Sequence, residues 1–396
     1  MSESGGADMG MAGAGRAALS LDPAAQAGNP AALGGLLRST VTAAVMPLDI
    51  ELDFRVPAET PPVASNRTGV TPVPALYGAW RDDRITYGLG VYSNVGLAFD
   101  LGTKWAGNRS MERAGLNTLN IAPAVAYAVN DRLTVGASVA AQLARYEAAV
   151  AVANDALYYG PPVGLPDGRL KIDGDSWAPG GQVGLTYRVN DRIRTGLAWT
   201  SAVHHSFASD VHAHDVHPVL AALLPGDGDV ELDATLPQQV LLGATHQSTP
   251  DTVIALGLSW QDWSSLDDAT VKMPGQTSDL FPAGLNDTWG ASIGVRHSFG
   301  PQWHVTAGIA YDSDPAANGQ VPAYFPVAEQ WRFAAGAERS YGDDLTLRVC
   351  ASIMAQGDAR FVQTTHALPL PGIPSLQGTI EDSRVYVLGF GADFAM

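Results

Sequence analysis

The 396-residue sequence predicts an all-β protein, a 14-stranded antiparallel transmembrane β-barrel. Three observations lead to this prediction. Short turns alternate with long loops along the chain, and the segments between them alternate apolar with small or polar side chains. The sequence contains no run of about eighteen apolar residues, which is the length that a membrane helix needs. Short turns on one side of the membrane and longer loops on the other are typical of outer-membrane barrels.

Residues 1–37 do not follow the strand pattern. The segment is rich in Ala and Gly, above all over residues 9–17 and 28–32. Small residues let a backbone approach its surroundings closely, and Pro30 suits the first position of a short helix. We expect residues 1–37 to form a hatch, or plug, inside the lumen, and residues 38–396 to form the barrel. A disordered tail is the alternative from composition alone.

Side-chain alternation predicts the strands. Over residues 133–139 the odd positions are apolar and the even positions are Thr, Gly and Ser, and similar alternation recurs over 253–260 and 345–353. Segments of about ten to fifteen residues are longer than the strands of a soluble sandwich, and they suit the nine to eleven residues that a tilted strand needs to cross a bilayer. A soluble β-propeller is the alternative fold, but no blade-length repeat is visible.

The connections set the number of strands. Six are short and contain turn-forming residues, at 81–83, 130–131, 190–191, 248–250, 300–302 and 342–344. Seven are long, near 56–71, 103–118, 149–174, 209–234, 264–286, 313–327 and 360–381. Together they imply fourteen strands, with the long loops outside the cell.

Aromatic residues cluster at the strand ends, as expected at the two membrane interfaces. Beside the short turns lie Trp80, Tyr127, Tyr187, Trp303 and Tyr341, and near the long loops lie Trp177, Trp260, Trp263, Trp289 and Tyr311. Tyr386, Leu388, Phe390 and Phe394 share one face of the last segment, as in a final barrel strand. The sequence therefore predicts a multi-pass protein of the bacterial outer membrane.

Composition narrows the partners. The net charge of −17 makes nucleic acid an unlikely partner. The single cysteine, Cys350, excludes a disulfide framework, and we expect neither a cofactor nor a metal, although His204, His205, His212, His214 and His217 cluster near one long loop. Acidic loops could bridge to lipopolysaccharide through divalent cations, but solvated loops are the simpler interpretation.

Residues 1–20 lack a secretory signal, so an exported chain is expected to be the mature form.

Several ordered motifs resemble the FadL-like outer-membrane transporters of long-chain fatty acids and other hydrophobic compounds. The most specific are Met-Gly-x-Ala-x-x-Gly-Arg-Ala at 9–17 and Asn-Pro-Ala at 29–31. Further matches lie at 93–98, 262–264 and 308–312. The resemblance implies a barrel plugged by a hatch that includes Gly10, Gly13, Gly15, Asn29, Pro30 and Ala31.

The resemblance also implies a lateral opening at a kink in the third strand. The corresponding residues are Ser93, Asn94, Val95 and Gly96. Asn and Gly tolerate backbone conformations that interrupt a ladder, although an ordinary strand glycine would be the interpretation without the resemblance. Hydrophobic ligand would be captured outside and released through this opening.

Two long loops carry apolar residues suited to capture. They are Leu157, Tyr158 and Tyr159 in one loop and Val219, Leu220, Leu223 and Leu224 in the other. Packing of one loop on another is the competing interpretation. No ATP motif is visible, so we expect transport by diffusion.

The class of ligand depends on the charges in the lumen. Strand parity places Arg188, Arg194, Arg296, Arg332 and Arg348 inside, where they could meet a carboxylate or pair with Asp8, Asp22 or Glu338. Val150 and Asn286 stand where the fatty-acid transporters of this family carry basic residues, and Arg145 is expected to point outward. Long-chain fatty acids are the first expectation, and uncharged aromatic or aliphatic hydrocarbons are the alternative.

An outer-membrane enzyme of the lipase type is the least favoured alternative. Residues 290–294 match the pattern of a nucleophile elbow, but that motif needs a strand-to-helix turn and here lies within a predicted strand. No Ser/His/Asp set can be assembled at one level of the predicted wall. The protein is therefore expected not to be an enzyme.

Overall fold

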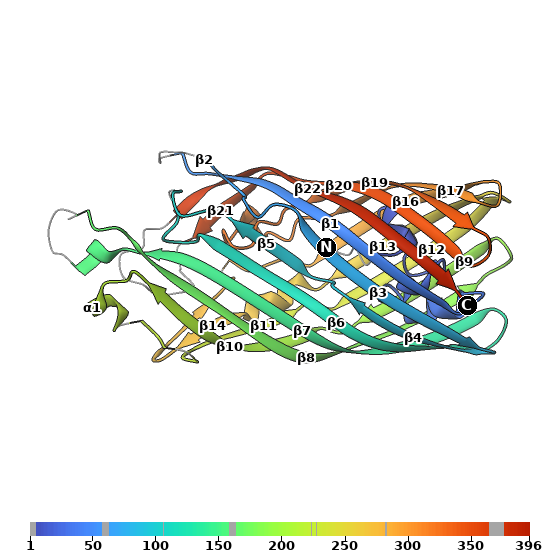
Figure 1. Ribbon diagram of the computed structural model, residues 1–396, viewed down its shortest axis with the longest axis horizontal. Helices are drawn as coiled ribbons and strands as arrows, with labels where there is room; N and C mark the ends of the chain where they lie inside the picture. The colour runs from blue at the N-terminus through green and yellow to red at the C-terminus, as the bar shows by residue number, and fades with distance from the viewer. Residues whose placement is uncertain are drawn as a thin grey trace.

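A closed antiparallel barrel forms the body of the protein (Figure 1). The computed structural model describes residues 5–57, 63–105, 107–157, 164–222, 224–226, 228–281, 283–363 and 376–396. The wall consists of β1 (Thr40–Arg55), β3 (Thr71–Asp82), β4 (Ile85–Tyr92) with β5 (Gly96–Asp100), β6 (Arg113–Ala128), β7 (Leu133–Val152), β8 (Gly168–Arg188), β9 (Ile193–Thr200) with β10 (Val203–His214), β11 (Val230–Leu236) with β12 (Gln239–Thr249), β13 (Thr252–Gln261), β16 (Thr288–Phe299), β17 (Trp303–Asp312), β19 (Gln330–Tyr341), β20 (Leu345–Gln356) and β22 (Leu376–Ala395).

Counting each interrupted strand once gives the fourteen strands that the sequence predicts. β1 pairs with β3 on one edge and with β22 on the other, which closes the circle. Closure leaves no free sheet edge between the first and the last wall strand, so their backbone groups are satisfied within a bilayer, where water cannot do this. No helix in the described part of the chain is long and apolar enough to span a membrane.

The smaller elements lie in the long connections. They are β2 (Val63–Ser65), β14 (Thr270–Met273), β15 (Gln276–Asp279), β18 (Gln320–Val321), β21 (Ala359–Gln363), α1 (Pro218–Ala221), and the 3-10 helices η4 (Asn154–Leu157), η5 (Trp263–Asp268) and η6 (Ala317–Gly319). Several strands also extend into predicted loops: β6 begins at Arg113, and β7 and β8 contain 20 and 21 residues. The predicted loop boundaries are wrong there because these strands continue above the membrane, where the outer face carries charged residues such as Arg145.

Most of the aromatic girdle lies where it was expected. Trp80, Tyr127 and Tyr341 are each 45% exposed near the short turns, and Trp177 and Trp289 are exposed toward the other end. Trp263 is the exception, because its ring lies 5.4 Å from that of Phe325 and faces a cavity. The expectation of an interfacial role for Trp263 is therefore wrong, since η5 turns its side chain inward.

Residues 5–36, here called the N-terminal segment, lie inside the barrel, near the end that carries the C terminus (dark blue in Figure 1). They contain the 3-10 helices η1 (Ala7–Met11), η2 (Pro23–Ala27) and η3 (Pro30–Gly35). η1 contacts β16, β17, β19 and β20, and η3 contacts β4, β6, β7 and β8. The segment therefore touches most of the inner wall.

Glycines make this close contact possible on both sides. A Cβ on Gly10 would lie 2.1 Å from Thr306 Oγ1, and one on Gly308 of the wall would lie 2.2 Å from the carbonyl oxygen of Met11. Gly13 and Gly15 have φ values of 77° and 69°, which favour glycine. The Gly-rich motif thus has a steric reason inside the lumen.

The Asn-Pro-Ala motif begins η3. The side chain of Asn29 accepts a hydrogen bond from the backbone N–H of Ala31 at 3.0 Å, and Pro30 occupies the first turn. Nδ2 of Asn29 donates to the carbonyl oxygens of Ala17, at 2.6 Å, and of Leu185 in β8, at 3.0 Å. One side chain therefore caps a helix, joins two parts of the segment and ties them to the wall.

A buried ion-pair triad fixes the segment to the opposite side of the wall. Arg348 of β20 lies 2.6 Å from Asp22 and 2.7 Å from Asp393 of β22, with only 8% of its side chain exposed. Asp22 also accepts backbone hydrogen bonds from Ala7 and Ala24. Removing one partner of such a group leaves uncompensated buried charge.

We predict that Arg348→Met lowers the free energy of unfolding by about 3–5 kcal/mol, because Asp22 and Asp393 would then face each other without a cation. Urea titration of the protein folded into lipid vesicles measures the loss. Arg384→Met is the matched control, because Arg384 is half exposed on the outer face. Equal stability of the two variants would show that the triad does not anchor the segment.

Candidate functional site

A cavity of about 490 Å³ occupies the barrel above the N-terminal segment. Ala12, Gly13 and Arg16 of that segment form its floor, and Val95, Gly96 and Leu97 open onto it from the wall. Its size lies in the range of pockets that bind small molecules. The cavity therefore connects the outer loops, the N-terminal segment and the third wall strand.

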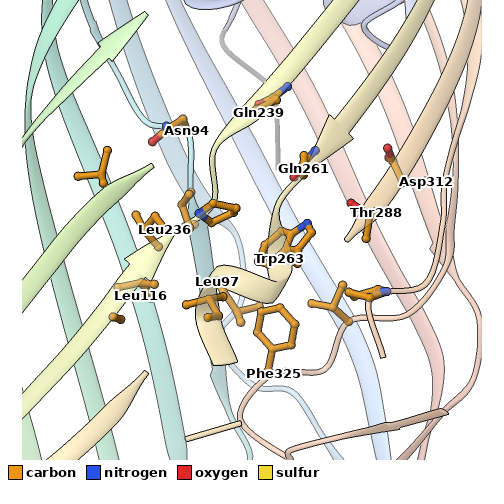
Figure 2. A pocket seen from close by; sticks show the side chains of 18 of the residues that line it. Asn94, Leu97, Leu116, Leu236, Gln239, Gln261, Trp263, Thr288, Asp312 and Phe325 are labelled. Atoms are coloured by element: carbon orange, nitrogen blue, oxygen red, sulfur yellow. The ribbon is translucent and has the colours of Figure 1, made fainter. Parts of the chain in front are cut away.

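The cavity is apolar toward the outside and polar toward the N-terminal segment. Figure 2 shows Leu97, Leu116, Leu236, Trp263 and Phe325 gathered in one region, with Asn94, Gln239, Gln261, Thr288 and Asp312 in another. In several parts of the wall the polar residue lies closer to the short-turn end than the nearby apolar one, as with Gln239 of β12 and Leu236 of β11, or Gln261 of β13 and Trp263 of η5. A molecule entering from outside thus meets apolar side chains first.

The third wall strand is interrupted at Ser93, Asn94 and Val95, between β4 and β5. Neither Asn94 nor Gly96 has a positive φ, so the expected reason for the interruption, a glycine-like backbone conformation, is wrong. Side-chain hydrogen bonds hold it instead. Oδ1 of Asn94 accepts from Thr118 Oγ1 at 2.9 Å, from Asn120 Nδ2 at 2.9 Å and from Gln142 Nε2 at 3.2 Å.

The interruption leaves a gap in the wall ladder. β3 pairs with β4 only from Leu76 to Asp82, and no ladder joins β3 to β5 within the described residues. Pro72 faces Pro47 of β1, and two prolines cannot exchange hydrogen bonds, so the nitrogens of Pro72 and Pro74 point away from β1 and toward the gap. The edge of β3 at the gap therefore lacks two N–H donors that would otherwise be unsatisfied.

A strap formed by residues 66–68 bounds the outer end of the gap. The N–H of Arg67 donates to the carbonyl oxygen of Asp100 at 2.8 Å, and the N–H of Asp100 donates to Oδ1 of Asn66 at 3.0 Å. Asn66 in turn donates to the carbonyl oxygen of Ile50 in β1 at 2.7 Å. The gap in the ladder, here called the window, is thus bounded above by the strap and below by the β3–β4 ladder.

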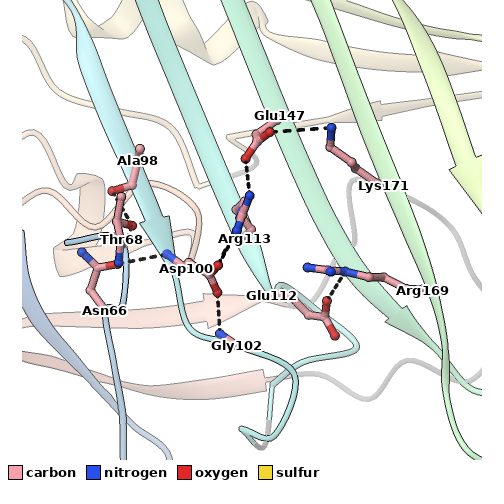
Figure 3. A network of polar contacts seen from close by, with 10 residues as sticks. All are labelled: Asn66, Thr68, Ala98, Asp100, Gly102, Glu112, Arg113, Glu147, Arg169 and Lys171. Atoms are coloured by element: carbon pink, nitrogen blue, oxygen red, sulfur yellow. Dashed lines mark hydrogen bonds and ion pairs between the residues drawn. The ribbon is translucent and has the colours of Figure 1, made fainter. Parts of the chain in front are cut away.

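Charged side chains clamp the strands beside the strap (Figure 3). Arg113 lies 2.6 Å from Asp100 and 3.0 Å from Glu147, and Arg169 lies 2.7 Å from Glu112. Burial raises the pKa of Asp100, but hydrogen bonds from Arg113 and the N–H of Gly102, with the Arg113 charge, outweigh it and hold the pKa below its usual value. The carboxylate form of Asp100 is therefore part of the clamp.

Four of the five arginines that strand parity places in the lumen form ion pairs or lie beside the N-terminal segment. Arg188 is exposed instead, so its predicted place inside is wrong. Arg296 lies 2.7 Å from Glu338, Arg348 pairs as described above, and Arg194 donates to Ser20 Oγ at 3.0 Å. Arg332 is buried among the cavity residues beside Gly13, and Arg188 lies at a short turn, where it bonds to the carbonyl oxygen of Asp131. The expected pairing of arginines with Asp22 and Glu338 is confirmed.

The other positions weighed for a ligand carboxylate add no cation. Val150 lines the cavity, Asn286 bonds to the carbonyl oxygen of Ala316, and Arg145 is exposed on the outer face. Arg109 and Arg113 do line the cavity, but each is paired with acidic side chains. These cationic groups thus already have partners of opposite charge.

A ring of polar side chains at one level of the wall escaped the sequence analysis. Adjacent strands place Gln182 opposite Thr200, Thr200 opposite Gln239, Gln239 opposite Gln261, and Gln261 opposite Thr288. Asp312 likewise stands opposite Gln330, and Gln330 opposite Gln356. All of them line the cavity. The signal was present as a recurring Gln or Thr at the outer end of successive strands.

Only part of the predicted capture surface lies within the residues that the structure describes. Tyr158, Tyr159 and Leu223 lie outside the described residues, as does the side chain of Leu157. Leu220 is buried in a cluster with Val152, Leu170 and Ile172, and Leu224 packs against it. Val219 is exposed. Leu220 and Leu224 therefore fit the loop-packing interpretation.

Two other sequence features do not form sites. The described part of the chain contains no group of three His, Cys, Asp or Glu side chains placed to hold a metal ion. Residues 290–294 lie inside β16, so they do not form the strand-to-helix turn of a nucleophile elbow.

A closed membrane barrel with an amphipathic cavity, its N-terminal segment inside and an interrupted wall strand is an outer-membrane channel of the hydrophobic-compound type. Family comparison agrees: residues 1–395 match the model of the outer membrane protein transport protein family (OMPP1/FadL/TodX), and the chain belongs to that family. It is a bacterial outer-membrane protein.

Curated relatives are transport or outer-membrane proteins. The chain is 23% identical to the long-chain fatty acid transport protein of Escherichia coli O6:H1 over 392 residues, covering 92% of this chain and 88% of that one. It is 26% identical to the 47 kDa outer membrane protein of Pasteurella multocida, covering 86% and 82%.

Solved structures share the fold. A Pseudomonas aeruginosa FadL homologue superposes with a TM-score of 0.83 at 19% identity, covering 100% of this chain and 98% of that one. The toluene transporter TodX of P. putida superposes with a TM-score of 0.73 at 17% identity, covering 100% and 99%.

We predict that Asp100→Asn loosens the strap. Exchange protection of the Arg67 N–H should fall about 1.5- to 5-fold, since exposed ion pairs contribute about 0.2–1 kcal/mol. Hydrogen exchange with mass spectrometry measures it. Because the pKa of Asp100 is depressed in the folded state, its contribution is present above the unfolded pKa and disappears as the pH falls through the folded one.

Asp233→Asn is the matched control, because Asp233 also pairs with a cation, Lys272, but lies on β11 away from the strap. The control should leave exchange at Arg67 unchanged. Equal effects of both substitutions, or none from Asp100→Asn, would contradict the assignment of the clamp.

Proposed function

We propose that this protein is a channel for the diffusive uptake of hydrophobic molecules, which enter from the outer loops and leave through the window between β3 and β5. The single observation that carries the proposal is that one cavity contacts both the N-terminal segment and the interrupted strand. Residues 1–37 act as a hatch in this proposal, residues 38–396 form the barrel, and residues 93–96 form the lateral gate.

The packing of the hatch supports a lateral exit. A route straight along the lumen would have to displace a segment held by the Arg348 triad, by Asn29 and by glycine contacts with the wall. The window requires no such displacement, and it opens at the level of the hydrocarbon, where an apolar ligand is stable. No described residues suggest an energy source, so the ligand's own gradient drives the movement.

Capture begins at the outer loops. Leu165 and Val219 are exposed apolar residues there, and the cavity below them is lined by Phe207, Leu266 and Phe281. Burial of a hydrophobic ligand against these side chains is favourable at about 25 cal/mol per Å² of apolar surface. Outer-membrane lipid, with lipopolysaccharide around the loops, is the proposed surrounding of this route.

The charges of the site favour an uncharged ligand. Arginines at positions 16, 109, 113 and 332 line the cavity, and the first three each lie beside an acidic side chain. A carboxylate would have to compete for them, and burying it unpaired is costly. Uncharged hydrocarbons are therefore the ligand class that the geometry supports best. Long-chain fatty acids are the second candidate, favoured by the names of curated relatives.

Uptake assays distinguish these candidates. Bacteria that lack their own channels of this family would express the full chain, and the initial uptake of a labelled alkylbenzene and of labelled oleate would be compared with cells carrying the empty vector. We expect the alkylbenzene to enter faster than in the vector cells. Acceleration of neither compound would contradict the proposal, and acceleration of oleate alone would reverse the order of the candidates.

Gly96→Trp should block the window. A Cβ at Gly96 meets only Asn117 Oδ1, at 3.6 Å, so the large side chain can be accommodated at the backbone while it fills the opening. We expect uptake to fall to nearly the vector level, with the amount of folded barrel in the membrane unchanged. The same uptake assay, with electrophoretic mobility of the unheated barrel, checks this.

Gly226→Trp provides the control, because Gly226 is exposed in an outer loop and also lacks a positive φ. Its uptake should match that of the native sequence. Undiminished uptake by a folded Gly96→Trp variant would exclude the window as the route.

A further inference from the structure

The ring of polar side chains lies directly beside a group of apolar residues in the cavity. It lies between the apolar outer part of the cavity and the N-terminal segment, at the level of Asn94. Its members on β12 and β13, Gln239 and Gln261, stand directly opposite each other, with Thr288 next on β16. Three adjacent strands therefore present two amides and a hydroxyl to the same space.

The two amides differ from the other amides that line the cavity in their hydrogen bonding. Gln142 and Asn120 bond to each other at 2.8 Å, and Gln142 bonds to His205 at 3.0 Å. Gln182 donates to the carbonyl oxygens of Ala27 and Gly28. Among the described residues, the side chains of Gln239 and Gln261 have no hydrogen-bond partner in the protein, although both face the cavity.

The charge of the ring restricts what it can bind. Gln, Asn and Thr are neutral, and the acidic member, Asp312, disfavours an anion beside it. An amide both donates and accepts, so a pair of amides suits a head group that does the same. A purely apolar molecule would leave these groups without partners, which has a cost in a water-poor site.

We propose that Gln239 and Gln261 form a subsite for the neutral, oxygen-bearing head group of an amphipathic ligand, such as an alcohol, a ketone or a protonated carboxylic acid. The tail of the ligand lies among Leu97, Leu116, Leu236, Trp263 and Phe325, and the head reaches the ring. This inference rests on the proposed function, keeps its uncharged ligand, and changes the preferred class from hydrocarbons to amphipaths with an oxygen-bearing head group.

Equilibrium binding to the full chain in amphipol tests the subsite. The probes are 1-dodecanol, dodecane and dodecanoate at pH 8, each quantified by gas chromatography after separation of bound from free ligand. We expect dodecanol to bind the native chain more tightly than dodecane. Gln239→Leu and Gln261→Leu should each weaken dodecanol binding about fivefold, the effect of one net hydrogen bond, without weakening that of dodecane.

Gln377→Leu is the matched control, because it makes the same substitution at an exposed position of β22 away from the cavity. Electrophoretic mobility of the unheated barrel confirms that each variant is folded. Equal binding of dodecanol and dodecane, unaffected by both ring variants, would overturn the subsite and leave the proposed function intact. Tighter binding of dodecanoate than of dodecanol would overturn the neutral head group.

If the native chain bound none of the three probes, the proposed function itself would fail. The subsite is supported if dodecanol binding weakens in Gln239→Leu and in Gln261→Leu but not in Gln377→Leu. A variant that weakened dodecane as strongly as dodecanol would indicate altered packing, and this outcome would also count against it.

Discussion

The need to satisfy backbone hydrogen bonds where no water is available governs the whole structure. A wall of fourteen strands meets this need by closing β1 onto β22, so that ladders run around the barrel. Every departure from a regular ladder then requires a local substitute. At the interruption of the third strand the substitutes are the side chain of Thr118, which bonds to the N–H and the carbonyl oxygen of Val95, and the side chain of Asn120, which donates to the carbonyl oxygen of Tyr92. Prolines on the facing edge have no N–H to satisfy.

The lumen is subject to a related constraint, because polar groups lie in it close to apolar ones. Arg348 holds the N-terminal segment through buried charge, and wall glycines such as Gly308 let the backbone of the segment approach directly. Charge is thereby used for anchoring and is largely neutralised before the ligand path begins. The path itself is lined mainly by apolar side chains and neutral amides, and the arginines at positions 109 and 113 that also line it are paired with acidic side chains.

Sequence alone predicted the strand count and the pairing of lumen arginines, because alternation and turn chemistry are local properties. It overestimated the loops beside β6, β7 and β8, since the alternation fades once a strand leaves the membrane. It missed the ring because Gln239, Gln261 and Gln330 are far apart in the chain and meet only through strand register. It located the interruption but gave the wrong cause, since Asn94 acts through its side chain rather than through its backbone.

The Pro-Val-Pro sequence at 72–74 has a consequence beyond the passage of a ligand. An unpaired strand edge in a protein can usually recruit a strand from another chain, which leads to strand exchange or aggregation. With Pro72 and Pro74 at its edge, β3 offers a foreign strand too few donors to continue the ladder. Pro72 and Pro74 would thus reduce intermolecular strand addition at the gap when many newly inserted barrels share one membrane.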